Sequence, residues 1–342
     1  MKKNHCHWAV PLIGVLLMGT GVSVLAEQDK YTYLDSTNRV TLSLRFGLNI
    51  HAKFTGIGSA GGAGHYFDGY VLTDSTGNYL GYTSYWGYNN ASQYNYPPNN
   101  TFSFHRPAAT GITSEISDSD NPYPGVELTY DRQLGIKEDW HHMRYGVEGA
   151  LNYMKISMNN NSSYNAAVTT DTYPFGGIAG QQPLPGFQGS FSGNPGDPVL
   201  VVPGTSTTTP GGTLQTQDHF DADLWGGRLG PYVELPLTKN FDLRLSGGLA
   251  VGLLNGNGSW QEKFYLNGNT IGTLSGGGDD FDALWGYYVS LDATWQINHR
   301  WSLDGAVQFQ DLGTYDHNFG GRGVELDLSR SLFVELGVSY SF

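Results

Sequence analysis

The final stretch of the chain, Leu328 to Phe342 (LSRSLFVELGVSYSF), places the tightest limit on the fold. From Leu332 onward, apolar side chains alternate with mostly polar ones, which is the pattern of a β-strand with one apolar face. The alternation continues to an aromatic residue at the C-terminus. We therefore expect this strand to close a barrel against the first strand and to cross a bilayer, because a spanning sheet must leave no open edge. The alternative is the terminal strand of a soluble β-sandwich.

The composition agrees with a β-rich protein. The chain has 342 residues, of which 48 are Gly and 22 are Tyr, and only 14% are charged. This balance disfavours a helical or α/β protein. The mean hydropathy of −0.33 does not argue against a membrane protein, because barrel strands carry a polar residue at every second position. After the N-terminal region, no apolar segment is long enough for a membrane helix.

The N-terminal residues predict a secretory signal peptide over residues 1–26. Lys2 and Lys3 precede an apolar segment, and the small residues Val24 and Ala26 suit cleavage after Ala26. Cleavage would remove Cys6, the one cysteine, and would change the formal net charge from −13 to −15. Such an acidic chain does not suit nucleic-acid binding. Residues 27–38 are expected to form a polar periplasmic lead.

Eight segments of alternating apolar residues predict an all-β fold, a transmembrane antiparallel up-and-down β-barrel over residues 39–342. Connections alternate between long and short, so we expect long extracellular loops, the longest at about 55–124 and 158–220, and short periplasmic turns. A ten-stranded wall would result if 66–73 with 79–86, or 101–105, entered it. Pro231 should produce a bulge or a local distortion, because proline lacks the N–H that a ladder needs. The expected strands are about 40–54, 125–134, 143–156, 223–235, 241–253, 281–297, 301–312 and 332–342.

Aromatic residues gather near both ends of these segments. Membrane barrels carry such residues as two girdles, one at each interface. The expected periplasmic girdle is Trp140, Phe241, Trp295, Trp301, Tyr340 and Phe342, and the expected outer girdle is Tyr153, Trp225, Trp285 and Tyr287.

The terminal pattern of Leu336, Val338, Tyr340 and Phe342 resembles the assembly signal of bacterial outer-membrane β-barrels. In strand number and topology, the mature chain resembles the group formed by the OmpA transmembrane domain, OmpX and OmpW. It departs from OmpA in lacking a peptidoglycan-binding domain after the barrel, and from OmpX in its two very long outer loops. The resemblance implies an outer-membrane location, contact with lipid and lipopolysaccharide, recognition of the last strand by the barrel-assembly machinery, and a monomer.

Charged residues occupy the side of the strands that should face the lumen. A narrow eight-stranded barrel has little room for a water column, so we expect these charges to pair into a polar core. Arg45 and Glu335 lie mid-strand on the two closing strands and are expected to pair. The alternative is a gated ion or proton path. The predicted lumen residues are Arg45, Glu127, Arg144, Glu148, Arg228, Glu234, Asp242, Arg244, Asp292, Asp304 and Glu335.

The first long loop is rich in Tyr, Gly, Ser and Asn, a mixture typical of adaptable binding surfaces. Aromatic faces also stack on sugars, so a surface glycan, lipopolysaccharide or another cell is a candidate partner. The alternative is a loop that folds over the barrel mouth through its own aromatic residues. The binding candidates are Tyr82, Tyr85, Trp86 and Tyr88.

No segment matches a known barrel-enzyme motif, so no catalytic residue is assigned. His219 with Asp221 and Asp223, or His65 with Asp68, are the candidates for an acid–histidine site, but acid beside histidine is common. The sequence predicts no metal site and no cofactor. We expect a non-enzymatic outer-membrane protein whose loops bind or shield; a narrow pore for small polar solutes is the main alternative, and an enzyme is the third.

Overall fold

The computed structural model describes residues 37–59, 62–108, 112–117, 122–138 and 142–342. The predicted signal peptide, most of the periplasmic lead and Trp140 lie outside these ranges. Within them, regular structure is almost entirely β-strand. No helix in the described ranges has the length and apolar character needed to cross a bilayer.

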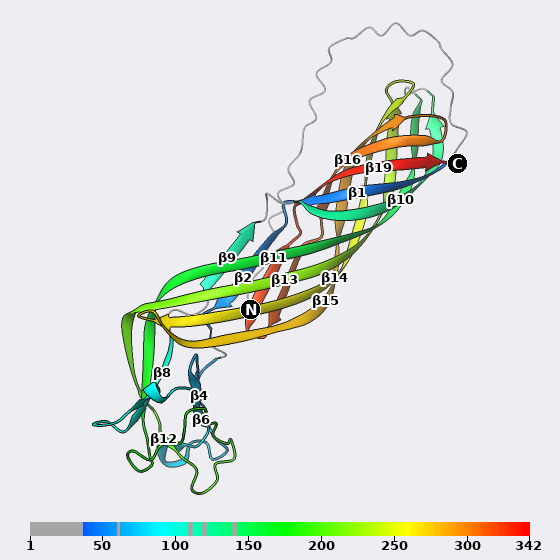
Figure 1. Ribbon diagram of the computed structural model, residues 1–342. Helices are drawn as coiled ribbons and strands as arrows, with labels where there is room; N and C mark the ends of the chain where they lie inside the picture. Colours follow the sequence, from blue (N-terminus) through cyan, green and yellow to red (C-terminus); the bar gives the residue numbers. More distant parts are fainter. Residues whose placement is uncertain (1–36, 60–61, 109–111, 118–121, 139–141) are drawn as a thin grey trace, which may run out of the picture. The chain divides into compact units, whose positions relative to one another are not determined.

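Eight antiparallel strands form a closed ring (Figure 1). The first and last strands pair, with Arg45 directly opposite Glu335, and β10 pairs with β1 and β11 to complete the wall. The predicted eight-stranded barrel is therefore confirmed, and the segments 66–73, 79–86 and 101–105 do not enter the ring. In ring order the strands are β1 (Asn38–Leu48), β19 (Ser331–Ser341), β16 (Trp301–Asp311), β15 (Asn269–Gln296), β14 (Phe241–Leu266), β13 (Thr205–Pro236), β11 (Met143–Pro174) and β10 (Tyr123–Lys137).

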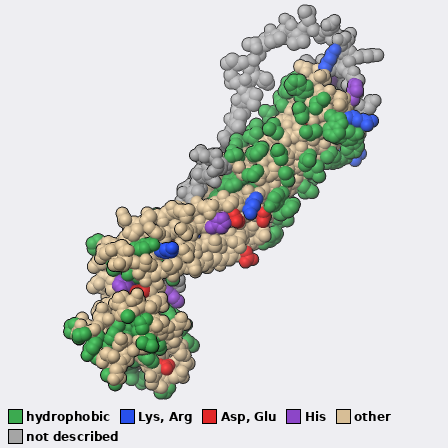
Figure 2. All heavy atoms as spheres, viewed as in Figure 1, with side chains coloured by type: hydrophobic (Ala, Val, Ile, Leu, Met, Phe, Trp, Pro, Cys, Tyr) green, Lys and Arg blue, Asp and Glu red, His purple; other side chains and the backbone are tan. Residues whose placement is uncertain are grey.

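The barrel wall is apolar outside and charged inside. Leu42, Leu151, Leu249 and Trp285 face outward and are between 63% and 76% exposed. Figure 2 shows hydrophobic side chains gathered over the barrel strands. The alternate positions carry buried polar and charged side chains, as the period of two along a strand requires. Such a distribution is the reverse of that in a soluble protein.

Pro231 interrupts one ladder of the wall without shifting its register. Leu229 pairs with Leu249 and Tyr232 pairs with Ser246, while the two positions between them form no bridge between β13 and β14. The expected distortion is thus a local gap and not a bulge. The two strands also approach closely here: a Cβ on Gly248 would lie 2.2 Å from the carbonyl oxygen of Leu229, so only glycine fits.

Four wall strands run much farther than expected. β11 continues to Pro174 and pairs with β13 as far as Thr172 opposite Thr205, so much of the segment 158–220 is strand and not loop. β14 and β15 likewise continue to a tight turn at Asn267 and Gly268. Beyond residue 156 the alternation persists, but the outward side chains become polar, which suits strands that leave the apolar band.

The other four wall strands, β1, β10, β16 and β19, are shorter, and the strands that directly precede or follow them in the chain form a second sheet. Its order is β17 (Thr314–Phe319), β18 (Arg322–Asp327), β2 (His51–Ile57) and β9 (Ile112–Ser117). The first strand, expected to reach residue 54, ends at Leu48. Asn49 adopts a left-handed conformation (φ 59°) and donates from Nδ2 to the carbonyl oxygen of Arg330 at 2.7 Å. The segment between the strands β16 and β19 forms the β17–β18 hairpin.

An apolar core fills the space between the second sheet and the long strands. Phe54, Phe220, Leu254, Tyr315 and Phe319 are each no more than 1% exposed. The core extends to Tyr288 and Phe333 on the barrel strands. Side chains at lumen-facing positions are therefore charged in one section of the barrel and apolar in the next.

The remaining described segments form what we call the aromatic loop unit, residues 62–107 and 172–203. β8 pairs with the far end of β11, and the other elements are short strands and single 3-10 turns. Its core consists of Tyr66, Val71, Trp86, Tyr88, Phe102, Phe104, Phe175 and Leu200. The elements are β3 (His65–Tyr66), β4 (Gly69–Val71), η1 (Tyr79–Gly81), β5 (Tyr82–Thr83), β6 (Trp86–Tyr88), η2 (Ala91–Gln93), β7 (Tyr94–Asn95), β8 (Thr101–Pro107) and β12 (Leu200–Val201).

Candidate functional site

Every strand of the ring contributes a charged side chain to the lumen. We call these side chains the lumen network, and nearly all of them are buried. Five are arginines and eight are carboxylates, so the carboxylates are in formal excess by three. The network comprises Arg39, Arg45, Arg144, Arg228 and Arg244 with Glu127, Asp131, Glu148, Glu234, Asp242, Asp292, Asp304 and Glu335.

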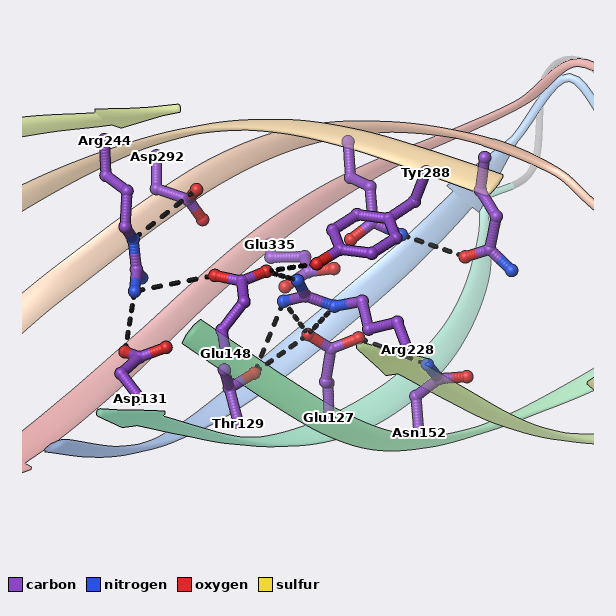
Figure 3. A network of polar contacts seen from close by, with 12 residues as sticks. Glu127, Thr129, Asp131, Glu148, Asn152, Arg228, Arg244, Tyr288, Asp292 and Glu335 are labelled. Carbon is purple, nitrogen blue, oxygen red and sulfur yellow. Dashed lines mark hydrogen bonds and ion pairs between the residues drawn. The ribbon is translucent and has the colours of Figure 1, made fainter. Parts of the chain in front are cut away.

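Glu127 is the centre of one half of the network (Figure 3). Its Oε2 accepts from Nη1 of Arg45 at 2.5 Å, and its Oε1 accepts from Nη2 of Arg228 at 2.6 Å. Arg228 also pairs with Glu148, whose Oε1 accepts from the hydroxyl of Tyr288 at 2.9 Å. Hydrogen-bonded charges in such a poorly solvated space bind each other strongly and hold their partners in fixed positions.

Arg244 continues the network toward the ends of the strands at the short turns. Its Nη1 lies 2.6 Å from Oδ2 of Asp131 and 3.7 Å from Oε2 of Glu148. Asp131 also binds Nε of Arg39 at 3.0 Å, and Nη2 of Arg39 binds Glu234 at 2.8 Å. The arginines therefore bridge carboxylates of different strands.

Arg144 lies at this same end of the lumen, with Arg39 and Arg244. Nη1 of Arg144 lies 3.1 Å from Glu234 and its Nη2 lies 2.9 Å from Asp242. Asp242 also accepts from Nε2 of Gln296 at 2.8 Å. The polar contacts thus run from β1 through β10, β11, β13 and β14 to β15.

Glu335 and Asp304 are held less tightly by cations than Glu127 is. Nε of Arg45 lies 3.7 Å from Oε1 of Glu335, so the expected pair is present as a long ion pair without a hydrogen bond. Asp304 binds hydroxyl groups instead: it accepts from Thr294 at 2.7 Å and from Ser339. The structure brings all eleven predicted lumen residues into one interior. Which of them pair depends more on how far each side chain reaches across the lumen than on which strands are neighbours.

Two members of the network are absent from the sequence-based set. Arg39 and Asp131 have the same strand parity as Arg45 and Glu127, respectively. The parity rule would have found them had it been applied to the first residues of β1 and to the middle of β10.

Two small cavities lie along the network. One cavity of about 10 Å³ is lined by Thr41, Arg228, Asp292 and Glu335 among others, and another of about 30 Å³ lies beside Arg39 and Asp131. Volumes of this size hold about one or two water molecules. Beyond the network, the apolar core occupies the same interior.

A polar groove lies on the outward face of the long strands, past the apolar band. Its volume is about 530 Å³. Register places its side chains in two adjacent rows across four strands: Asn159, His219 and Ser259 in one, and Asn161, Gln217, Gln261 and Ser275 in the other. The floor is formed at Asp218, Trp260 and Gly276, which alternate with the outward positions. We refer to this feature as the polar groove.

The acid–histidine candidates are arranged differently from expectation. Nε2 of His219 lies 3.0 Å from Oδ2 of Asp221, and its Nδ1 lies 2.5 Å from Oδ1 of Asn159, so both ring nitrogens have partners. Partial burial acts to raise the pKa of Asp221, but hydrogen bonds from Ser157 and His219 hold that pKa below its ordinary value. Asp68 pairs with His105 and not with the expected His65, at 2.6 Å between Oδ2 of Asp68 and Nδ1 of His105.

The four aromatic binding candidates divide between surface and core. Tyr82 is 42% exposed, and Tyr85 packs edge-on against Tyr70 and Phe191. Trp86 and Tyr88 are buried in the aromatic loop unit, where Trp86 lies 4.8 Å from Phe102 between ring centroids. In this arrangement Tyr82 is the candidate most open to a partner.

The predicted assembly signal lies on the outer surface of the last strand. Leu336, Val338 and Phe342 are between 44% and 62% exposed, and Tyr340 packs against Trp301 at 5.0 Å between ring centroids. Its recognition by assembly machinery stays a prediction.

Comparison with known proteins gives likeness in structure alone. No protein-family model and no curated sequence matches the chain. Among solved structures, it is similar to Ail of Yersinia pestis in complex with the heparin analogue sucrose octasulfate (8% identity, 89% of this chain and 99% of that one, TM-score 0.28). It is also similar to OprG of Pseudomonas aeruginosa (11%, 88% and 95%, TM-score 0.31) and to the outer membrane protease OmpT of Escherichia coli (10%, 92% and 100%, TM-score 0.31).

The architecture itself is diagnostic. A closed ring of eight antiparallel strands leaves no open edge in the wall, its outside is apolar and its inside is charged. That combination is the one found in transmembrane β-barrels of the outer membrane. The chain is an eight-stranded β-barrel protein of the outer-membrane type.

Proposed function

We propose that the protein is a closed, non-enzymatic outer-membrane anchor whose extracellular strands and loops form a surface for binding. The observation that carries this proposal is the filled interior. Charged side chains from all eight strands, in ion pairs except for the hydroxyl-bound Asp304, occupy one section of the lumen, and the apolar core occupies the next. An interior packed in this way supports an anchoring role and leaves binding to the extracellular part.

The extent of the apolar face supports a membrane-spanning barrel. On β14, outward apolar residues run from Phe241 to Leu253. Twelve steps of roughly 3.3 Å give about 40 Å along the strand, and a tilt of about 35–45° reduces this to about 30 Å along the barrel axis. This length matches the hydrocarbon thickness of a bilayer, about 30 Å.

The pore and the enzyme remain alternatives with less support. A pore needs a continuous wet path, whereas two cavities among the described residues of the lumen network hold about one or two waters each. An acid–histidine site needs a ring nitrogen free to take a proton from a nucleophile or water. Both nitrogens of His219 are engaged, by Asp221 and Asn159.

The proposal is tested by the conductance of the refolded protein in a planar bilayer. Folding is checked beforehand by the change in gel mobility between unboiled and boiled samples, and only shifted protein is used. We expect no current steps across the bilayer over hours of recording, because the packed interior gives ions no hydrated route. Discrete, reproducible current steps from fully shifted protein would overturn the proposal in favour of the pore.

A further inference from the structure

The polar groove continues the outward face that contacts lipid. Along β11, Leu151 and Tyr153 have the same parity as Asn159 and Asn161, so all four side chains point out of the same wall. Asn159 lies six residues beyond Tyr153 of the expected outer girdle, which is about 20 Å along the strand. The groove therefore faces the space directly above the lipids that surround the barrel. Figure 2 shows the continuation of the long strands as largely tan surface, which is backbone and uncharged polar side chains, with a group of charged and histidine side chains where it meets the apolar band.

The groove is built from neutral groups that both donate and accept hydrogen bonds. Asn and Gln amides supply two donors and an acceptor each, and Ser hydroxyls supply one donor and two lone pairs. The one outward side chain able to carry a charge is His219, which Asp221 and Asn159 hold. Exposed amides and hydroxyls without an excess of charge match a ligand that is itself neutral and rich in hydroxyl groups.

The charged residue at the floor is turned away from the groove. Asp218 is 2% exposed; Nε of Arg322 lies 2.9 Å from its Oδ1, and Nδ2 of Asn160 donates to its Oδ2 at 2.8 Å. Trp260 donates from its indole N–H to the carbonyl oxygen of Phe319 at 2.9 Å. A ligand in the groove would thus meet backbone and no exposed charged group at the floor. The groove's volume of about 530 Å³ lies within the range of ligand-binding sites.

We propose that the polar groove binds the uncharged part of the sugar chain of a glycolipid in the outer leaflet, next to the barrel. The groove faces the space directly above the surrounding lipids, where the sugar chain of a membrane-anchored glycolipid lies. Its position therefore favours a glycolipid over a free glycan as the ligand. Orientation by a lipid anchor also lowers the entropic cost of binding a flexible sugar chain. This inference rests on the proposed outer-membrane location of the protein, and it adds the class of ligand.

The test uses the core oligosaccharide of lipopolysaccharide, freed of lipid A and dephosphorylated, titrated calorimetrically into the folded full-length protein in detergent. Lipopolysaccharide in vesicles, lipid A alone, and a dextran oligomer of equal length form the other arms. We expect the core oligosaccharide to bind, lipopolysaccharide to bind more tightly, and lipid A to show no dependence on groove residues.

The chain offers a closely matched pair of variants. Gln217 and Gln215 lie two residues apart on the same face of β13, and only Gln217 borders the groove. Gln217→Ala should weaken core-oligosaccharide binding about tenfold, and Gln217→Ala with Gln261→Ala more than that, as loss of one and two neutral hydrogen-bonding groups predicts. Gln215→Ala should bind as the parent does.

Three outcomes would overturn the inference. The first is equal weakening by Gln215→Ala and Gln217→Ala in protein that keeps its gel shift. The second is binding of lipid A alone that depends on Gln217. The third is binding of dextran as tight as that of the core oligosaccharide, which would indicate a free neutral glycan. None of these results bears on conductance, so failure here is separable from failure of the closed-anchor proposal.

Discussion

At the scale of single residues, Glu127 and not Glu335 should dominate the stability of the lumen network. Glu127 accepts short hydrogen bonds from two arginines, whereas the ion pair of Glu335 with Arg45 is long, at 3.7 Å between Oε1 and Nε. Glu127→Gln should lower the free energy of unfolding by about 3 kcal/mol, because it leaves buried cations without a counter-charge. Glu335→Gln should cost about 1 kcal/mol or less, since it removes one carboxylate from an excess.

The measurement is urea unfolding of both variants in lipid vesicles, followed by tryptophan fluorescence and gel mobility. A larger loss for Glu335→Gln than for Glu127→Gln would contradict the geometry of the network. Arg300→Ala, at an exposed turn position, serves as the control and should unfold as the parent does.

Asp74 should make the aromatic loop unit sensitive to acid. Burial acts to raise its pKa, but hydrogen bonds from Thr76, Ser84 and Asn78 outweigh burial and lower the pKa to about 2. The unfolded value is about 3.9. Because the folded pKa is depressed, the stabilisation is complete above about pH 4 and is lost as the pH falls toward 2.

Limited digestion by pepsin between pH 4 and pH 2 would detect this loss. Cleavage within residues 62–107 should rise as the pH falls, faster than the intrinsic activity of pepsin on a denatured substrate. Asp74→Asn should be cleaved readily already at pH 4. Identical digestion profiles for this variant and the parent would argue against the role of Asp74.

The sequence predicted which residues face the lumen but not which of them touch. Parity follows from the two-residue period of a strand and needs no tertiary information, so all eleven predicted residues lie inside. Contacts across the lumen depend on stagger and side-chain reach. Arg228 on β13 therefore binds Glu127 on β10, which is not its ladder neighbour, and no local pattern encodes that pair.

At the scale of elements, the sequence located the eight wall strands but predicted four of them too short: β11 and β14 end later than expected, and β13 and β15 begin earlier. The apolar stripe of β11 stops near residue 156, whereas its pairing with β13 continues to Thr172. Hydrogen bonding of strands does not require an apolar outer face, so the Asn- and Thr-rich sequence beyond the apolar stripe forms strand although its composition is that of a loop. The expected first strand joins β1 and β2, which the left-handed Asn49 separates, and the short strands β9, β17 and β18 are not among the expected strands.

The aromatic loop unit should unfold independently of the barrel. Its core is separate from the one above the lumen network, and Trp86 is fully buried at its centre. Trp86→Ala should cost about 3–5 kcal/mol locally and expose residues 62–107 and 172–203 to trypsin or chymotrypsin. The barrel should keep its gel shift.

Tyr79→Ala is the matched control, since Tyr79 lies in the same unit and is 71% exposed. It should leave protease resistance unchanged. Loss of the barrel gel shift in Trp86→Ala would show that the unit and the wall fold as one.

At the scale of the whole molecule, the interior has two layers that close the barrel. One is held by ion pairs and the other by the packing of apolar side chains. The lumen network fills one section with charge pairs that leave room for about one or two waters in each cavity. The apolar core excludes water from the next section by burial of large side chains such as Phe220 and Phe319. A charged layer alone could admit a water file, whereas an apolar layer several side chains deep could not.

The measurement that tests this closure most directly is thiol accessibility inside the barrel. The one cysteine of the sequence, Cys6, lies in the predicted signal peptide, so single cysteines can be introduced without background. Ala222→Cys and Ala250→Cys place a thiol in the apolar core at positions that are 1% exposed, and Ser275→Cys places one in the exposed polar groove. All three folded proteins would be treated with a small water-soluble thiol reagent from both sides of a vesicle. A closed interior predicts rapid labelling at position 275 and no labelling at 222 or 250 until the protein is boiled; labelling of 222 and 250 at rates near that of 275 would contradict it.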